Sequence, residues 1–73
     1  MSMATYASRN RSRRYGLHRM GQWLMPPADP TGPLAFADDP AGAWVAFNLD
    51  EALRRQTLLR QTRGLATVVR ALP

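Results

Sequence analysis

The chain has 73 residues, enough for one small domain, and its formal net charge is +5. It has no cysteine, which excludes disulfide bonds and thiolate metal sites. No apolar run in the sequence approaches the roughly 20 residues that span a bilayer, so we expect a cytoplasmic protein without a membrane partner.

The charged residues are segregated along the chain, and all ten basic residues are arginines. Residues 1–20 contain five arginines and no acidic residue, whereas residues 21–53 contain all five acidic residues and no basic one. Residues 54–73 again contain five arginines and no acidic residue. Such asymmetry is more typical of an interaction surface or a charged tail than of a catalytic pocket.

The N-terminal segment divides into two parts. Residues 1–13, MSMATYASRNRSR, are polar, positively charged and poor in large aliphatic side chains, which predicts a disordered arm. Residues 14–73 are then expected to form one small α+β domain. Within it, residues 14–25 combine two glycines with several large apolar side chains. This pattern predicts a short strand or an irregular segment held against the core.

A rigid loop and a β-hairpin are predicted next. Residues 26–33, PPADPTGP, contain four prolines, each of which fixes φ and removes a backbone donor. Residues 34–37 and 43–47 have the composition of two short strands, and the intervening DDPAG has turn chemistry. We therefore expect a hairpin with a five-residue loop. Its strands would bring three aromatic side chains into the core: Phe36, Trp44 and Phe47.

An amphipathic helix is the clearest predicted element. Asn48 is a suitable N-cap, Glu51 stands at the capping-box position, and Gly64 is a natural residue for the C-terminal cap. Its buried face is expected to contain Leu49, Ala52 and Leu53, with Leu59 as a further candidate. Residues 65–72, LATVVRAL, fit either a helical stripe or a strand, and we favour a C-terminal strand that joins the hairpin.

Residues suited to catalysis or metal binding are sparse. His18 is the single histidine and lies among arginines that oppose its protonation. Asp38 and Asp39 are adjacent carboxylates in a Pro/Gly turn, where turn formation is the commoner role. No glycine-rich phosphate loop is present. The sequence therefore predicts no enzyme, no metal site, no cofactor and no small-molecule substrate.

The arginine-rich N-terminal region is the main candidate for binding. Arginine keeps its charge and presents a planar fork of donors matched to phosphates and carboxylates. An aromatic side chain beside it can stack on a base or pack on a protein. The candidate residues are Arg9, Arg11, Arg13, Arg14, Tyr15, Arg19 and Trp23. A solvated tail is the alternative, and Trp23 fits a core position as well as an interface.

A second basic set lies on the predicted helix. Arg55 and Arg63 are eight residues apart, which places them on roughly one face. They could form a basic strip that faces an acidic partner or nucleic acid. An ordinary solvated helix face is the alternative.

The segment SRNRSRRYGLHRM resembles the arginine-rich segments that open several phage transcription antitermination proteins. In size and general character, the chain is similar to small phage-encoded regulators that bind RNA polymerase. This resemblance implies binding near the RNA exit channel of bacterial RNA polymerase, through the N-terminal region of β′ and the β flap. It also implies that the protein blocks host promoter recognition and suppresses transcription termination.

The acidic block at residues 21–53 departs from simple arginine-rich antiterminators and implies a folded, protein-binding domain. Two alternatives remain open at the level of sequence. One is a protein that binds DNA or RNA directly through the arm. The other is a small structural subunit of a nucleoprotein assembly.

Overall fold

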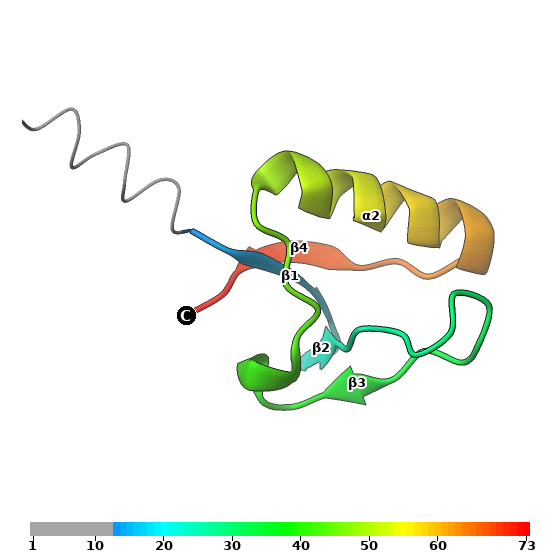
Figure 1. Ribbon diagram of the computed structural model, residues 1–73, viewed down its shortest axis with the longest axis horizontal. Coiled ribbons are helices and arrows are strands. Elements are labelled where there is room, and N and C mark those ends of the chain that lie inside the picture. Colours follow the sequence, from blue (N-terminus) through cyan, green and yellow to red (C-terminus); the bar gives the residue numbers. More distant parts are fainter. Residues whose placement is uncertain (1–12) are drawn as a thin grey trace, which may run out of the picture.

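One helix packs on a four-stranded antiparallel sheet in the computed structural model, which describes residues 13–73 (Figure 1). The elements are β1 (Tyr15–Arg19), β2 (Gln22–Leu24), β3 (Phe36–Ala37), the 3₁₀ helix η1 (Pro40–Gly42), α2 (Leu49–Arg63) and β4 (Val68–Ala71). The strand order is β3-β2-β1-β4. The predicted α+β class is therefore confirmed. The predicted disordered arm spans residues 1–13. Residues 1–12 lie outside the described residues, and Arg13 is exposed and lies outside the strands.

Strands β1 and β2 form a tight hairpin from the segment that was predicted to be a short strand or a pinned irregular stretch. Arg19 pairs with Gln22, so the loop has two residues, Met20 and Gly21. Both have positive φ, 52° and 83°, as a type I′ turn requires. Met20 lacks the usual Asn or Asp signature of this turn, so the local sequence did not predict the hairpin.

The hairpin predicted over residues 34–47 is wrong. Only Phe36–Ala37 forms a strand there, and it pairs with β2. The Asp39 side chain accepts a hydrogen bond from Ala41 N–H at 2.9 Å and caps η1 instead of closing a hairpin. Ala46 then exchanges two backbone hydrogen bonds with Tyr15, at 2.8 and 2.9 Å. The turn chemistry was correctly recognised, but tertiary pairing with β1 decides where the following segment goes.

The predicted helix is confirmed together with both of its caps. Asn48 Oδ1 accepts the Glu51 N–H at 2.7 Å, and the Glu51 carboxylate accepts the Phe47 N–H at 2.9 Å. Gly64 ends the helix with φ of 65° and ψ of 20°, a left-handed conformation that glycine adopts without a steric penalty. These local hydrogen bonds explain why the helix boundaries could be read from the sequence.

The predicted orientation of the helix is wrong at two positions. Ala52 and Leu59 are buried as expected, but Leu49 and Leu53 are 47% and 43% exposed. A polar contact on the side of the helix that faces the sheet contributes to this rotation: the Gln56 amide donates to the carbonyl of Thr67 at 2.6 Å. The helix therefore turns a polar and small-residue stripe inward and leaves leucines on its flanks.

The core lies between α2 and the sheet. Its buried members are Leu17, Leu24 and Leu59, and the partly buried side chains packed on them are Leu34, Phe36, Trp44 and Val69. The core positions predicted for Phe36 and Trp44 hold, whereas Phe47 is 67% exposed, so its predicted core position is wrong. Residues 43–47 do not form the strand that would have turned Phe47 inward.

The preferred C-terminal strand is confirmed as β4. It pairs antiparallel with β1, with Leu17 opposite Val69, and not with residues 34–47 as expected. On the other sheet face, Trp23 packs so closely over Gly16 that a Cβ there would lie 2.9 Å from the indole ring. The hairpin β1–β2 thus supplies buried side chains to both faces of the sheet.

Candidate partner and nucleic-acid interface

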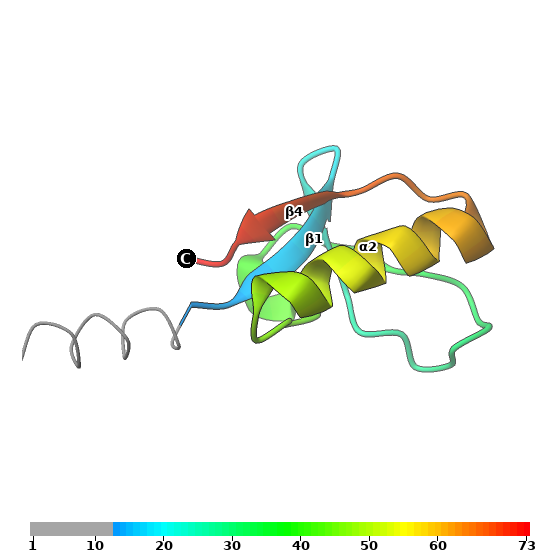
Figure 2. The same ribbon diagram turned by 90° about the horizontal axis from the view of Figure 1, so that it is seen from above.

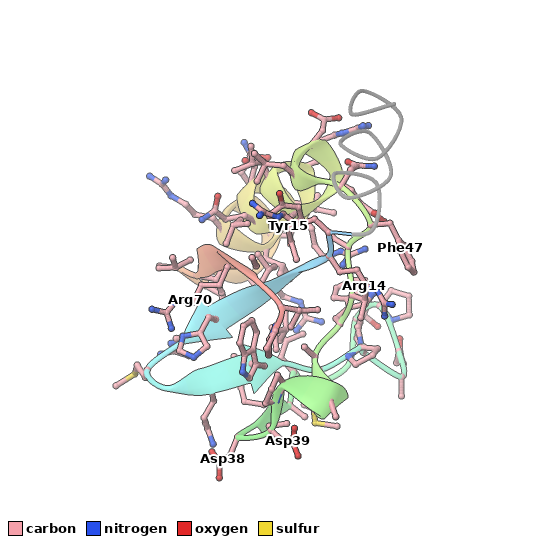
Figure 3. All side chains as sticks on the ribbon, turned by 90° about the vertical axis from the view of Figure 1, so that its left-hand side faces the viewer. Arg14, Tyr15, Asp38, Asp39, Phe47 and Arg70 are labelled. Carbon is pink, nitrogen blue, oxygen red and sulfur yellow. The ribbon has the colours of Figure 1, made fainter. Side chains whose placement is uncertain are left out.

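The start of β1 and the start of α2 lie at the same end of the molecule (Figure 1). Tyr15 and Ala46 form an isolated antiparallel bridge there. One step outward in this register, Arg14 lies opposite Phe47, and opposed residues of antiparallel strands project to the same face. Figure 3 shows the Arg14 and Phe47 side chains on the same side of the domain.

We call this surface the N-terminal patch and define it as Arg13, Arg14, Phe47 and Leu49. Both arginines are exposed, and neither forms an ion pair within residues 13–73. Phe47 and Leu49 are among the exposed large apolar side chains. The backbone is fixed here, because Leu72 N–H donates to the Arg14 carbonyl at 2.8 Å. The patch therefore offers cationic side chains beside apolar area on a fixed backbone.

An open groove lies beside the two arginines. Its cavity volume is about 630 Å³, and it is lined by Arg13, Arg14, Asp39, Pro40, Ala41, Val45, Leu72 and Pro73. The Asp39 carboxylate already accepts the Ala41 N–H, which orients it toward η1. The guanidinium groups of Arg13 and Arg14 form no ion pair within residues 13–73, and such groups are suited to phosphate or carboxylate oxygens.

The other residues predicted for the N-terminal region lie in different environments. Arg9 and Arg11 are outside the described residues. Tyr15 is half-buried, and Arg19 is exposed with its guanidinium 5.9 Å from the centroid of the Phe36 ring.

Trp23 belongs to the core. It is 8% exposed and meets the ring of His18 edge-on at a centroid distance of 4.9 Å. Of the two roles considered for Trp23, the structure shows the core role, so this ring offers no exposed surface for stacking. Sequence reasoning instead missed Phe47 as an exposed aromatic, because it placed residues 43–47 in a strand.

The predicted basic strip of Arg55 and Arg63 is used largely within the domain. The Arg55 guanidinium stacks 3.7 Å from the centroid of the Trp44 ring and bonds the Glu51 carboxylate at 3.1 Å. Burial of the guanidinium lowers the pKa of Arg55, and the charge of Glu51 partly opposes this. Arg63 donates to the carbonyl of Pro30 at 2.9 Å and holds the proline-rich loop. Neither arginine is a freely solvated surface group.

The carboxylates of Asp29, Asp38 and Asp39 accept hydrogen bonds within the domain. Asp39 caps η1, as expected for a turn-forming residue, whereas Asp38 accepts a hydrogen bond at 2.9 Å from the side chain of Gln22 on β2. Hydrogen bonds from the backbone and side chain of Thr31 lower the pKa of Asp29, and Arg63 lowers it further. Within residues 13–73, no three histidine, aspartate or glutamate side chains are grouped in a way that could hold a metal ion.

No family model, curated protein or solved structure matches the chain. No helix in the described part of the chain is both long and apolar enough to cross a membrane.

Proposed function

We propose that the protein is a non-enzymatic, cytoplasmic transcription regulator that binds bacterial RNA polymerase. Binding would involve the N-terminal region of β′ and the β flap, block host promoter recognition and suppress termination. The partner and these effects come from the resemblance to small phage-encoded regulators. What the domain adds in support is one observation, the N-terminal patch.

The patch supports a protein partner because it combines apolar and cationic groups on a fixed backbone. Phe47 is 67% exposed and Leu49 is 47% exposed, and both adjoin the first turn of α2. Aromatic and arginine side chains are enriched among the residues that dominate binding energy in protein interfaces. Arg14 lies opposite Phe47 in the register of the Tyr15–Ala46 bridge, and Arg13 adjoins the arginine-rich residues 1–12 in the sequence. A docked domain would thus direct the basic segment toward nearby nucleic acid.

Affinity purification with the full-length chain tests this proposal. The tagged protein is incubated with bacterial lysate, with and without nuclease, and the bound RNA polymerase subunits are quantified. We expect recovery that survives nuclease. The Phe47→Ser and Arg14→Ala variants should each reduce it at least about tenfold, in the range of interface hot spots.

Matched controls use one exposed apolar residue and one exposed arginine outside the patch. Leu58 is 58% exposed and Arg60 is exposed, and both lie in the C-terminal half of α2. Leu58→Ser and Arg60→Ala should leave recovery unchanged. Absence of polymerase from the wild-type eluate, or equal losses in patch and control variants, would refute the proposed docking surface.

Direct binding to DNA or RNA is the second candidate. It is favoured by Arg13 and Arg14, which form no ion pair within residues 13–73, and by the groove beside them. Phosphate contacts make affinity fall steeply with salt, by a slope that counts the phosphates neutralised. Titration of labelled single-stranded and duplex oligonucleotides at two salt concentrations measures that slope. If nuclease treatment abolishes the recovery of polymerase and the salt slope is steep, direct nucleic-acid binding is favoured over docking on RNA polymerase.

A further inference from the structure

The outer edge of β4 carries backbone groups that no other strand within residues 13–73 pairs with. Leu72 N–H donates to Arg14 of the neighbouring strand. Hydrogen-bonded positions alternate along an antiparallel ladder, so Arg70 also directs its backbone groups toward β1. Val69 and Ala71 then direct theirs away from it. Figure 2 shows β4 along one side of the domain.

This edge has few of the features that usually prevent pairing. Proteins protect open edges with proline, inward-pointing charges, bulges or a covering element. Strand β4 has the sequence VVRA, with Arg70 as its single charged residue, and its pairing with β1 is continuous. Val68 is 59% exposed on the sheet face that does not contact α2. The edge is therefore competent to accept another strand.

The flank of α2 nearest this edge is apolar at its N-terminal end. Residues 49, 53, 56 and 60 follow one another at spacings of four, three and four residues, which places them in one stripe along the helix. Gln56 in this stripe bonds the Thr67 carbonyl just before β4. Leu49 and Leu53 therefore lie on the side of α2 that faces β4, and both are nearly half exposed.

We propose that a second copy of the chain occupies this edge, forming a two-fold dimer with β4 paired antiparallel to β4 of its partner about Val69. This pairing joins the two four-stranded sheets into a single sheet of eight strands. A two-fold contact uses the same patch on both subunits. The inference does not depend on the proposed function, because β4 lies outside the N-terminal patch and the two contacts share only Leu49.

Charge and exposure select the register. Centred on Val69, the pairing exchanges two backbone hydrogen bonds between the two Val69 residues and places Val68 opposite the partner's Arg70. The aliphatic stem of each arginine can then cover the exposed valine while its charge stays in water. Centring on Arg70 instead would place the two arginines directly opposite each other, and like charges in that position are destabilising.

The helices are compatible with this pairing. In the dimer, three strand spacings, about 14 Å, separate the two β1 strands beneath the helices. A helix with its side chains is about 10–12 Å in diameter, so the facing flanks come close enough for their side chains to meet. Leu49 and Leu53 from both subunits would then cover the central valine pair. One contact thus accounts for exposed apolar residues on two different elements.

Single-cysteine variants test the register directly, because the natural chain has no cysteine. A disulfide requires Cα atoms within about 7 Å. In the proposed dimer, position 68 lies about 4.5 Å from position 70 of the partner, as a directly opposed non-hydrogen-bonded pair. Two copies of position 68, or of position 70, lie about 8 Å apart.

The experiment mixes full-length Val68→Cys and Arg70→Cys chains under mild oxidation and resolves the products on non-reducing gels. We expect the mixed disulfide to exceed either homodimeric product at least about tenfold, in line with the distance limit for disulfides. Preferential cross-linking of Arg70→Cys with itself, or equal yields of all three products, would overturn the proposed register.

Sedimentation of the full-length chain over a range of concentrations tests the dimer independently. The wild type should approach the mass of two chains. Ala71→Pro removes an outward N–H without removing a bond to β1 and should give a monomer that keeps its circular dichroism spectrum. Leu53→Glu should weaken the dimer, whereas Leu58→Glu, on the other flank, should not. A wild type that sediments as a monomer at every concentration would exclude the dimer.

Discussion

The hairpin β1–β2 and the helix α2 use their apolar residues in opposite ways. The hairpin buries Leu17, Trp23 and Leu24, and Leu24 is completely inaccessible. The helix has more leucines, yet Leu49, Leu53 and Leu58 are all exposed, and Leu59 is its one buried leucine. A short hairpin thus carries much of the stability, while the longest element presents apolar surface that is available for partners.

The largest effect should come from the hairpin side of this comparison. Leu24→Ala removes a fully buried side chain from the centre of the core and should lower the free energy of unfolding by about 2–5 kcal/mol. A domain of this size has only a few kcal/mol of net stability, so the variant should be largely unfolded at room temperature. Urea or thermal unfolding monitored by circular dichroism measures this. A native-like melting curve would show that the core lies elsewhere.

A smaller loss is expected where the hairpin packs most tightly. An added Cβ at residue 16 would lie 2.9 Å from the Trp23 ring, so Gly16→Ala should cost about 1–3 kcal/mol through overpacking. The same substitution in a Trp23→Leu background should cost much less, because the smaller side chain makes room. A double-mutant cycle of unfolding free energies checks this. Additive losses would mean that the close contact with Trp23 is not the cause.

At the helix, the N-cap should matter more than the exposed leucines. Asn48→Ala removes the side-chain acceptor of the Glu51 N–H and should cost about 1 kcal/mol. Asn48→Asp keeps an acceptor and should retain most of the stability. Equal losses in the two variants would argue against the capping hydrogen bond as the source of the effect.

The smallest effect should come from an exposed helix leucine. Leu53→Ala should change the unfolding free energy by less than about 1 kcal/mol, whereas Leu59→Ala, at a buried position, should cost about 2–5 kcal/mol. Measurements of both at low protein concentration keep any dimer dissociated. A Leu53→Ala loss as large as that of Leu59→Ala would restore the helix orientation expected from sequence.

The contrast also separates two kinds of experiment. Substitutions in the hairpin report on folding, so a loss of binding in such variants says little about an interface. Substitutions at Phe47, Leu53 or Leu58 leave the core intact and report on surfaces. This distinction is what makes the patch and edge variants useful tests of the proposed contacts.

Local hydrogen bonding made the helix predictable from sequence. Asn48 and Glu51 satisfy orphan backbone donors within a few residues of themselves, and Gly64 supplies the positive φ that ends the helix. The turn-forming role of Asp39 was equally local, since its carboxylate accepts the Ala41 N–H. The paired valines favoured a C-terminal strand over a helix. The α+β class was predicted from the helix, this strand and the hairpin over residues 34–47, and the class held although that hairpin did not form.

Only the tertiary structure decided which residues meet. Residues 43–47 had strand composition, but the bridge from Ala46 to Tyr15 tied them to β1 and left Phe47 outside. The rotation of α2 was set partly by distant polar partners of Gln56 and Arg63, which no periodicity within the helix encodes. Caps and turns depend on neighbours in the chain, whereas burial depends on contacts between distant segments, and this physical difference separates the predictions that held from those that failed.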